Sequence, residues 1–178
     1  EIHNEKNYLK NKLEKDKDII TLILGGPTKY YDYNNENIIK IFSKVNKHLI
    51  ENNLQLIFIP SNRTPKEIIT FAKEYFNKNR LIIETVDKKA YLSSLALSKY
   101  IVVTCDSSSM ISEAALTGKP IYVAMIPPKR NDKRFKKFRS LFEELNIIKE
   151  LGNELTSWSY KSLDETSRVA SKIKENLK

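Results

Sequence analysis

The feature that most constrains this chain is a repeated alternation of short apolar runs with amphipathic segments. Runs rich in β-branched residues are typical of strands that are buried on both faces. They occupy residues 19–24, 54–60, 80–86, 100–105, 120–126 and 147–151. Segments with apolar residues at helical spacing follow them, at residues 36–52, 65–76, 89–98, 109–118, 134–145 and 163–177. This order predicts an α/β fold, a doubly wound parallel sheet of Rossmann-like type.

Further expectations follow for individual segments. We expect the strand at 19–24 to be central in the sheet. The helix at 134–145 is predicted to face the core through Phe135, Phe138, Leu141, Phe142 and Leu145. Residues 1–17 are mostly charged and show no apolar stripe, so they are interpreted as a leader, either a linker or a frayed helix, before one domain at 18–178.

Composition excludes several classes of protein. With one cysteine the chain cannot form an internal disulfide, and with two histidines it offers no metal-ligand spacing, so neither a metal nor a cofactor is expected. No apolar run reaches the length of a membrane helix, which favours a cytoplasmic protein or one peripheral to the inner face of a membrane. The formal charge of +9 and the basic run at 129–139 are read either as solvated surface or as a contact for an anionic membrane. We expect no nucleic-acid partner.

Ligands of doubly wound sheets bind beyond the carboxyl ends of the strands, so the loops there are the candidate site. The loop after the first strand holds two of the four glycines, and that after the second offers small hydroxyls and an arginine suited to phosphate. The candidates are Gly25, Gly26, Thr28, Ser61, Arg63 and Thr64. Each has a purely structural alternative: a tight turn for the glycines, a surface position for Arg63, and a helix N-cap for Thr64.

The most specific stretch follows the fourth strand, where Asp106, Ser107, Ser108 and Ser109 precede a helix that carries Glu113. A helix N-terminus presents free N–H groups to an anion, and small residues leave a diphosphate room to reach them. Glu113, about one turn further on, is suited to ribose hydroxyls. The alternative is local capping, which accounts for one serine but not for three with an aspartate.

These segments resemble a known family. The stretches ITLILGGPTKYY, SNRTP, YIVVTCDSSSMISEAALTGKPIYV and WSYKSLDETSRVASKI look like the C-terminal half of a family that is called a mitochondrial-fission factor in plants and a nucleoside-diphosphate-sugar epimerase in bacteria. That family is similar to GT-B glycosyltransferases, whose C-terminal domain binds a nucleotide-sugar donor. The resemblance implies that Ser107, Ser108 and Ser109 hold phosphates and that Glu113 holds the ribose. Asn62 and Lys89-Ala90-Tyr91 depart from the family pattern, so no site is carried over to 86–91.

The resemblance implies the donor-binding domain of a GT-B-type glycosyltransferase, with a nucleoside-diphosphate sugar as ligand and an N-terminal partner domain outside this sequence. We therefore expect the isolated chain to turn over nothing, and we name no catalytic residue. NAD chemistry is not expected, because the Gly25-Gly26-Pro27-Thr28 loop lacks the dinucleotide fingerprint. The alternative is a non-catalytic interaction module that acts at a membrane surface.

Overall fold

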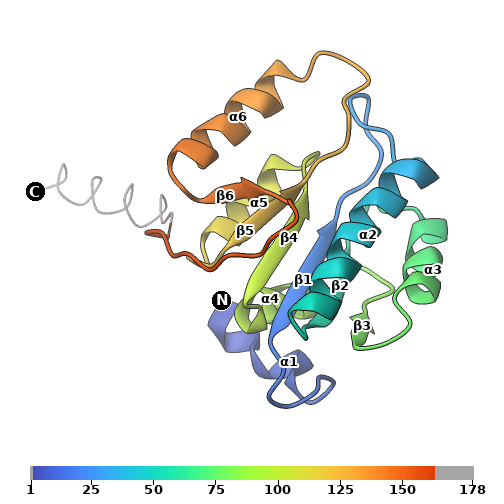
Figure 1. Ribbon diagram of the computed structural model, residues 1–178, viewed down its shortest axis with the longest axis vertical. Helices are drawn as coiled ribbons and strands as arrows, with labels where there is room; N and C mark the ends of the chain where they lie inside the picture. The colour runs from blue at the N-terminus through green and yellow to red at the C-terminus, as the bar shows by residue number, and fades with distance from the viewer. Residues whose placement is uncertain (1, 163–178) are drawn as a thin grey trace, which may run out of the picture.

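A computed structural model describes residues 2–162 of the chain, so the predicted helix at 163–177 lies outside the described residues. The six strands form one parallel sheet in the order β3-β2-β1-β4-β5-β6 (Figure 1). They are β1 (Ile19–Leu24), β2 (Gln55–Pro60), β3 (Arg80–Ile82), β4 (Tyr100–Thr104), β5 (Ile121–Ala124) and β6 (Ile148–Glu150). The predicted fold class is confirmed, and β1 lies between β2 and β4 as expected.

Helices cover both faces of the sheet. They are α2 (Asn35–Glu51), α3 (Lys66–Tyr75), α4 (Lys88–Leu97), α5 (Ser108–Ala115) and α6 (Lys133–Glu144). Right-handed crossovers place α2 and α3 on one face and α4, α5 and α6 on the other, with α2 in front of the sheet and α4 behind it in Figure 1. Every residue of β1, β2, β4 and β5 is buried, which explains why these strands read as continuous apolar runs.

Helix α6 departs from its predicted packing. Phe142 is buried and Phe135 and Phe138 pack partly against the core, but Leu141 and Leu145 are about half exposed, at 51% and 50%. Arg139, which was not among the predicted core residues, is buried and only 7% exposed. The expectation that Leu141 and Leu145 face the core is therefore wrong. Because α6 lies at one edge of the sheet, only part of its apolar face packs against the core.

The charged leader is joined to the domain. A 3-10 helix (Ile2–Glu5) and α1 (Asn7–Lys10) lie against α4. Leu9, which belongs to α1, is fully buried. The Leu9 N–H donates to the Ser93 hydroxyl at 3.1 Å, and the Tyr8 hydroxyl donates to Asp87 at 2.8 Å. The linker interpretation missed this anchor because a single buried leucine makes no periodic pattern.

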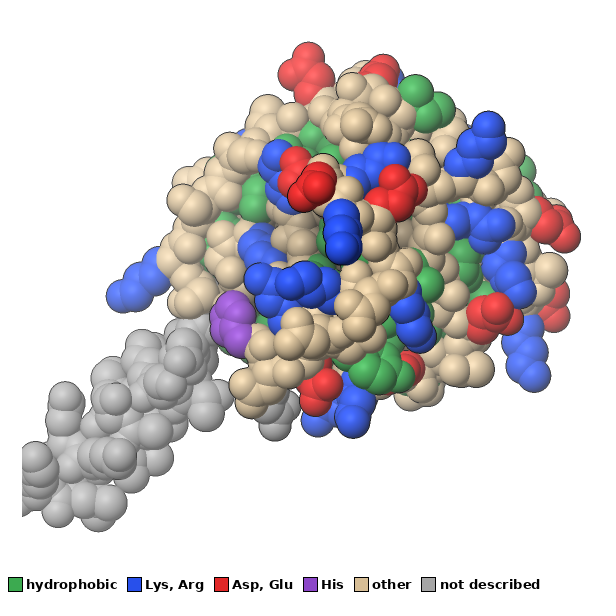
Figure 2. Space-filling view, turned by 90° about the horizontal axis from the view of Figure 1, so that it is seen from below, with side chains coloured by type: hydrophobic (Ala, Val, Ile, Leu, Met, Phe, Trp, Pro, Cys, Tyr) green, Lys and Arg blue, Asp and Glu red, His purple; other side chains and the backbone are tan. Residues whose placement is uncertain are grey.

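Charges are dispersed at the amino end of the sheet. Figure 2 views the molecule from this end, and Lys and Arg side chains there lie among Asp and Glu side chains over much of the face. The net positive charge is therefore not gathered into one cluster on this face.

Among the described residues, no helix is both long enough and apolar enough to cross a membrane.

Leu9→Ala tests the anchoring of the leader. Because Leu9 is fully buried, the substitution leaves a cavity and should lower the free energy of unfolding by about 2–5 kcal/mol. Ile50→Ala is the matched control, since Ile50 is 74% exposed and its loss should cost less than about 0.5 kcal/mol. Urea unfolding measures both, and equal effects would show that the leader is not part of the domain.

Candidate functional site

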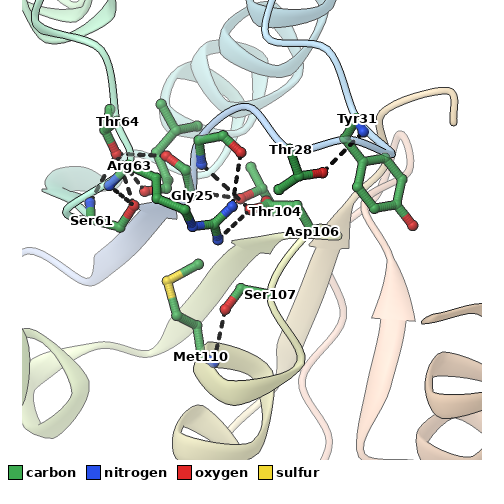
Figure 3. Close-up of polar contacts among 12 residues, drawn as sticks. Gly25, Thr28, Tyr31, Ser61, Arg63, Thr64, Thr104, Asp106, Ser107 and Met110 are labelled. Atoms are coloured by element: carbon green, nitrogen blue, oxygen red, sulfur yellow. Dashed lines mark hydrogen bonds and ion pairs between the residues drawn. The ribbon is translucent and has the colours of Figure 1, made fainter. Parts of the chain in front are cut away.

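Three strand-end loops meet at the carboxyl edge of the sheet. The loop after β1 carries Gly25 and Gly26, the loop after β2 carries Ser61–Thr64, and the loop after β4 carries Asp106 and Ser107 (Figure 3). All eleven predicted site residues belong to these loops or to α5. The topology thus places them at one edge, as expected for ligand-binding residues of a doubly wound sheet.

The Asp106 carboxylate lies at the centre of this edge and is fully buried. Arg63 Nη2 donates to it at 2.7 Å, the Gly26 N–H at 3.4 Å, and the Tyr33 hydroxyl donates to its other oxygen. Burial, reinforced by the Asp106 charge, raises the pKa of Tyr33 far above its usual range, so this hydroxyl stays a donor. Asp106 is thus engaged by protein groups from two other loops.

The two glycines are explained by this packing. A Cβ on Gly25 would lie 2.2 Å from Asp106 Oδ2, and a Cβ on Gly26 would lie 2.0 Å from the Arg63 carbonyl oxygen. The Gly25 N–H already donates to Thr104 Oγ1 at 2.8 Å. Close approach of the neighbouring loops is therefore sufficient reason for both glycines, and contact with a ligand stays a prediction.

The other candidates in these loops also have internal partners. Thr64 does not cap α3, because its hydroxyl lies within 2.8 Å of the Leu24 carbonyl and 2.6 Å of the Gly25 carbonyl. It accepts from the Ser61 N–H at 2.8 Å. Thr28 Oγ1 accepts from the N–H groups of Tyr30 and Tyr31, both at 3.1 Å. The loops after β1 and β2 therefore satisfy most of their own polar groups.

The start of α5 differs from these loops. Ser107 is the N-cap, and its hydroxyl accepts from the Met110 N–H at 3.4 Å. Within residues 2–162 the N–H groups of Ser108 and Ser109 have no hydrogen-bond partner, and Ser109 is exposed. Free N–H groups at a helix N-terminus, with the positive end of its dipole, favour an anion.

A pocket of about 570 Å³ opens beside this helix start, between α5 and α6. It is lined by Ser108, Ser109, Ser112, Glu113, Arg134, Phe135 and Phe138. Arg134 forms no ion pair with any described residue. The pocket thus combines free amides, hydroxyls, a carboxylate and an available guanidinium, which suits a ligand that has both phosphate and hydroxyl groups.

Tyr91 of α4 adds a hydroxyl close to Glu113. Burial raises its pKa well above the usual range, and the Glu113 carboxylate raises it further. Its oxygen is buried and finds no hydrogen-bond partner among the described residues. No site was expected at this position, because Tyr91 stands in the stretch where the chain departs from the family pattern.

A second buried network holds α6 in place. Arg139 Nη1 donates to the Tyr31 hydroxyl at 3.0 Å and Nη2 to Asp132 at 3.1 Å, and the Tyr31 hydroxyl donates to Asp132 at 2.6 Å. Arg139 also reaches the Cys105 carbonyl at the end of β4. The Tyr31 hydrogen bond and the Arg139 charge lower the pKa of Asp132. This network fixes one wall of the pocket, and the only sequence signal for it was an arginine on the face shared by Phe135 and Phe142.

Within the described part of the chain, no group of His, Cys, Asp and Glu side chains is placed to hold a metal ion. Cys105 is buried, and burial raises its pKa to about 11, so it is a thiol at neutral pH.

Asp106→Ala tests whether the loop network is structural. Removing the buried carboxylate leaves Tyr33, Gly26 and Arg63 without a shared acceptor, so the free energy of unfolding should fall by about 2–4 kcal/mol. Asp32→Ala is the control, because its 3.6 Å pair with Lys129 is solvent-exposed and should contribute less than about 1 kcal/mol. If denaturant unfolding shows no difference between the two variants, the network does not hold the loops together.

The chain is similar to known proteins both in sequence and in fold. The sequence model of the mitochondrial fission ELM1 family matches residues 1–177. Protein RP120 of Rickettsia prowazekii (strain Madrid E) is 34% identical over 170 residues, which cover 91% of this chain and 48% of RP120. The mitochondrial fission protein ELM1 of Arabidopsis thaliana is 31% identical over 122 residues, 66% of this chain and 28% of that protein. The chain thus spans about half the length of the first relative and less of the second.

Solved structures share the fold at low sequence identity. The Staphylococcus aureus MnaA–UDP co-structure has a TM-score of 0.58 at 17% identity, over 96% of this chain and 38% of that one. UDP-GlcNAc 2-epimerase from Neisseria meningitidis, bound to UDP-GlcNAc, has a TM-score of 0.54 at 13% identity, over 85% of this chain and 36% of that one. These neighbours support the Rossmann-like, GT-B-type architecture, and the family is shown by the sequence match over nearly the whole chain. The chain belongs to the mitochondrial fission ELM1 family.

Proposed function

We propose that this chain is the nucleotide-sugar (donor) binding part of a GT-B-type glycosyltransferase, and that the nucleoside diphosphate binds at the start of α5. The proposal rests on the N–H groups of Ser108 and Ser109, which have no partner in the described part of the chain and lie beside a pocket lined by Glu113 and Arg134. Two structures with a similar fold were solved with UDP or UDP-GlcNAc, which supports this ligand class.

Each pocket residue has a physical role in this proposal. The amides and hydroxyls of Ser108 and Ser109 donate to the diphosphate, and the helix dipole stabilises its charge. Arg134 supplies a cation from α6. Glu113 accepts hydrogen bonds from ribose hydroxyls, and the protonated Tyr91 hydroxyl lies close to Glu113.

The proposal gives Asp106 and Arg63 a supporting role. Their charges are paired at 2.7 Å, and Asp106 is fully buried, so direct contact of the carboxylate with a phosphate would be unfavourable. Their role is to hold the loops of β1 and β2 against that of β4, which positions Ser107 as the N-cap of α5. Catalysis would need the N-terminal partner domain, so the isolated chain should bind nucleotide weakly and transfer no sugar.

The alternative, a non-catalytic interaction module, is favoured by a different feature. An apolar groove of about 590 Å³ lies between α2 and the β5–α6 loop, where Ile39 and Met125 are exposed at 45% and 38%. The basic run at 129–139 begins at the same loop, and an anionic membrane surface is the proposed partner for it. This alternative requires no nucleotide at α5.

Substitution of Glu113 separates the two functions. Glu113→Ala should weaken UDP binding by about 1–3 kcal/mol, because hydrogen bonds to a charged group are lost. The affinity of the Glu113→Ala variant for inorganic pyrophosphate should equal that of the parent chain, since pyrophosphate has no ribose. Glu144→Ala, on the exposed end of α6, is the control and should leave UDP binding unchanged.

Ser108→Leu complements this test, because a bulky side chain at the pocket wall should abolish the binding of both ligands with the fold intact. Isothermal titration calorimetry measures each affinity, and circular dichroism checks each fold. If the parent chain binds no nucleoside diphosphate, or if both variants bind as the parent does, the donor-site proposal is wrong and the interaction module is favoured.

A further inference from the structure

The loop after β1 reaches the segment before α6 through two tyrosines. The Lys129 N–H donates to the Tyr30 carbonyl at 2.7 Å, and Tyr31 forms an isolated antiparallel bridge with Pro128. These backbone contacts join the loop after β1 to the chain that leads into α6. They are separate from the Asp106 network and give the glycine-bearing loop a second connection at the carboxyl edge of the sheet.

The Tyr31 hydroxyl lies at the centre of the network that holds α6. It donates to Asp132 at 2.6 Å and accepts from Arg139 Nη1 at 3.0 Å, so it bridges two residues of opposite charge. Tyr31 is fully buried, and burial raises the pKa of its hydroxyl well above the usual range. The hydroxyl therefore stays protonated and remains a donor to the carboxylate.

Asp132 contributes to this network instead of capping its own helix. It stands at the N-cap of α6, where an aspartate usually accepts a hydrogen bond from the first turn, but its side chain makes no capping bond. Its carboxylate is used by the Tyr31 hydroxyl and by Arg139 Nη2. Departures of this kind from a local rule are concentrated at functional sites.

Two residues that line the pocket lie between the anchor points of α6. Arg134 and Phe135 follow Asp132 and precede Arg139 in the chain. The Phe135 ring also makes an edge contact with the Tyr31 ring, with 5.7 Å between their centroids. The first turns of α6, which carry this wall of the pocket, are thus held by both the ring and the hydroxyl of Tyr31.

We propose that Tyr31 is a positioning residue for the pocket, which holds Arg134 where its guanidinium binds the phosphate of the ligand. Tyr31 is not among the residues that line the pocket, so it acts through α6. This inference rests on the proposed function, because Arg134 has a phosphate to bind only if a nucleoside diphosphate lies at the start of α5. It gives the loop after β1 a part in ligand binding that requires no contact with Gly25 or Gly26.

Tyr31→Phe tests this role, because it removes the hydroxyl and keeps the ring that packs on Phe135. Hydrogen exchange measured by mass spectrometry without ligand should show the amides of α6 exchanging at least about fivefold faster in this variant, as for a local opening. The amides of α2 should not change. Tyr8→Phe is the control, because the Tyr8 hydroxyl donates to Asp87 at the opposite end of the domain from α6 (Figure 1).

Calorimetric titration with UDP measures the effect on binding. Tyr31→Phe and Arg134→Ala should each lower the affinity about tenfold, since a hydrogen bond between charged groups is lost or misplaced. The variant with both changes should bind within about twofold of Arg134→Ala alone, because Tyr31 acts through Arg134. Asp132→Asn is a second variant that weakens the same network, and it should lower the affinity in the same way.

Thermal unfolding of each variant ensures that the titrations are made on folded protein. A merely structural role of Tyr31 would lower the unfolding temperature without coupling to Arg134. The inference is overturned if α6 exchanges equally in Tyr31→Phe and the parent chain, if both bind UDP equally well, or if the two losses of affinity add. Those outcomes leave the proposed function in place, whereas a parent chain that binds no UDP removes the proposed function and this inference with it.

Discussion

A single buried carboxylate organises the carboxyl edge of this domain. The Asp106 side chain has no exposed surface and receives hydrogen bonds from Arg63, Gly26 and Tyr33, each more than 40 residues away in the chain. A buried charge is tolerated only when its partners are in place, so the loops after β1, β2 and β4 must close together or not at all. The absence of a Cβ at Gly25 and Gly26 is what permits this closure.

The closed network decides where a ligand has room. Most polar groups of the loops after β1 and β2 are used within the protein, whereas the first N–H groups of α5, beside the pocket, have no partner within residues 2–162. Arg139 fixes the far wall of that pocket by joining α6 to Tyr31 and to the end of β4. Buried hydrogen bonds thus hold the elements on both sides of α5, and a preorganised site costs less ordering when a ligand binds.

The sequence predicted the sheet well, because strands buried on both faces must be apolar throughout, as β1 and β4 are. It also predicted a helix at 109–118 beside the serines, and α5 begins one residue earlier, at Ser108, with Ser107 as its N-cap. The role of Asp106 was not predictable, because Arg63 and Tyr33 are 43 and 73 residues away. Leu9 and Arg139 were missed for the same reason, as each is buried by contacts that no local pattern encodes.

The central claim is that the anion site is the start of α5 and not the glycine loop after β1. Titration of a ¹⁵N-labelled chain with UDP, followed by two-dimensional NMR, tests it directly. The account predicts the largest amide shifts at Ser108, Ser109 and Glu113, with those of Gly25 and Gly26 small because their N–H groups already donate to Thr104 and Asp106. Shifts centred on Gly25 and Gly26 with none in α5, or no shifts at all, would contradict it.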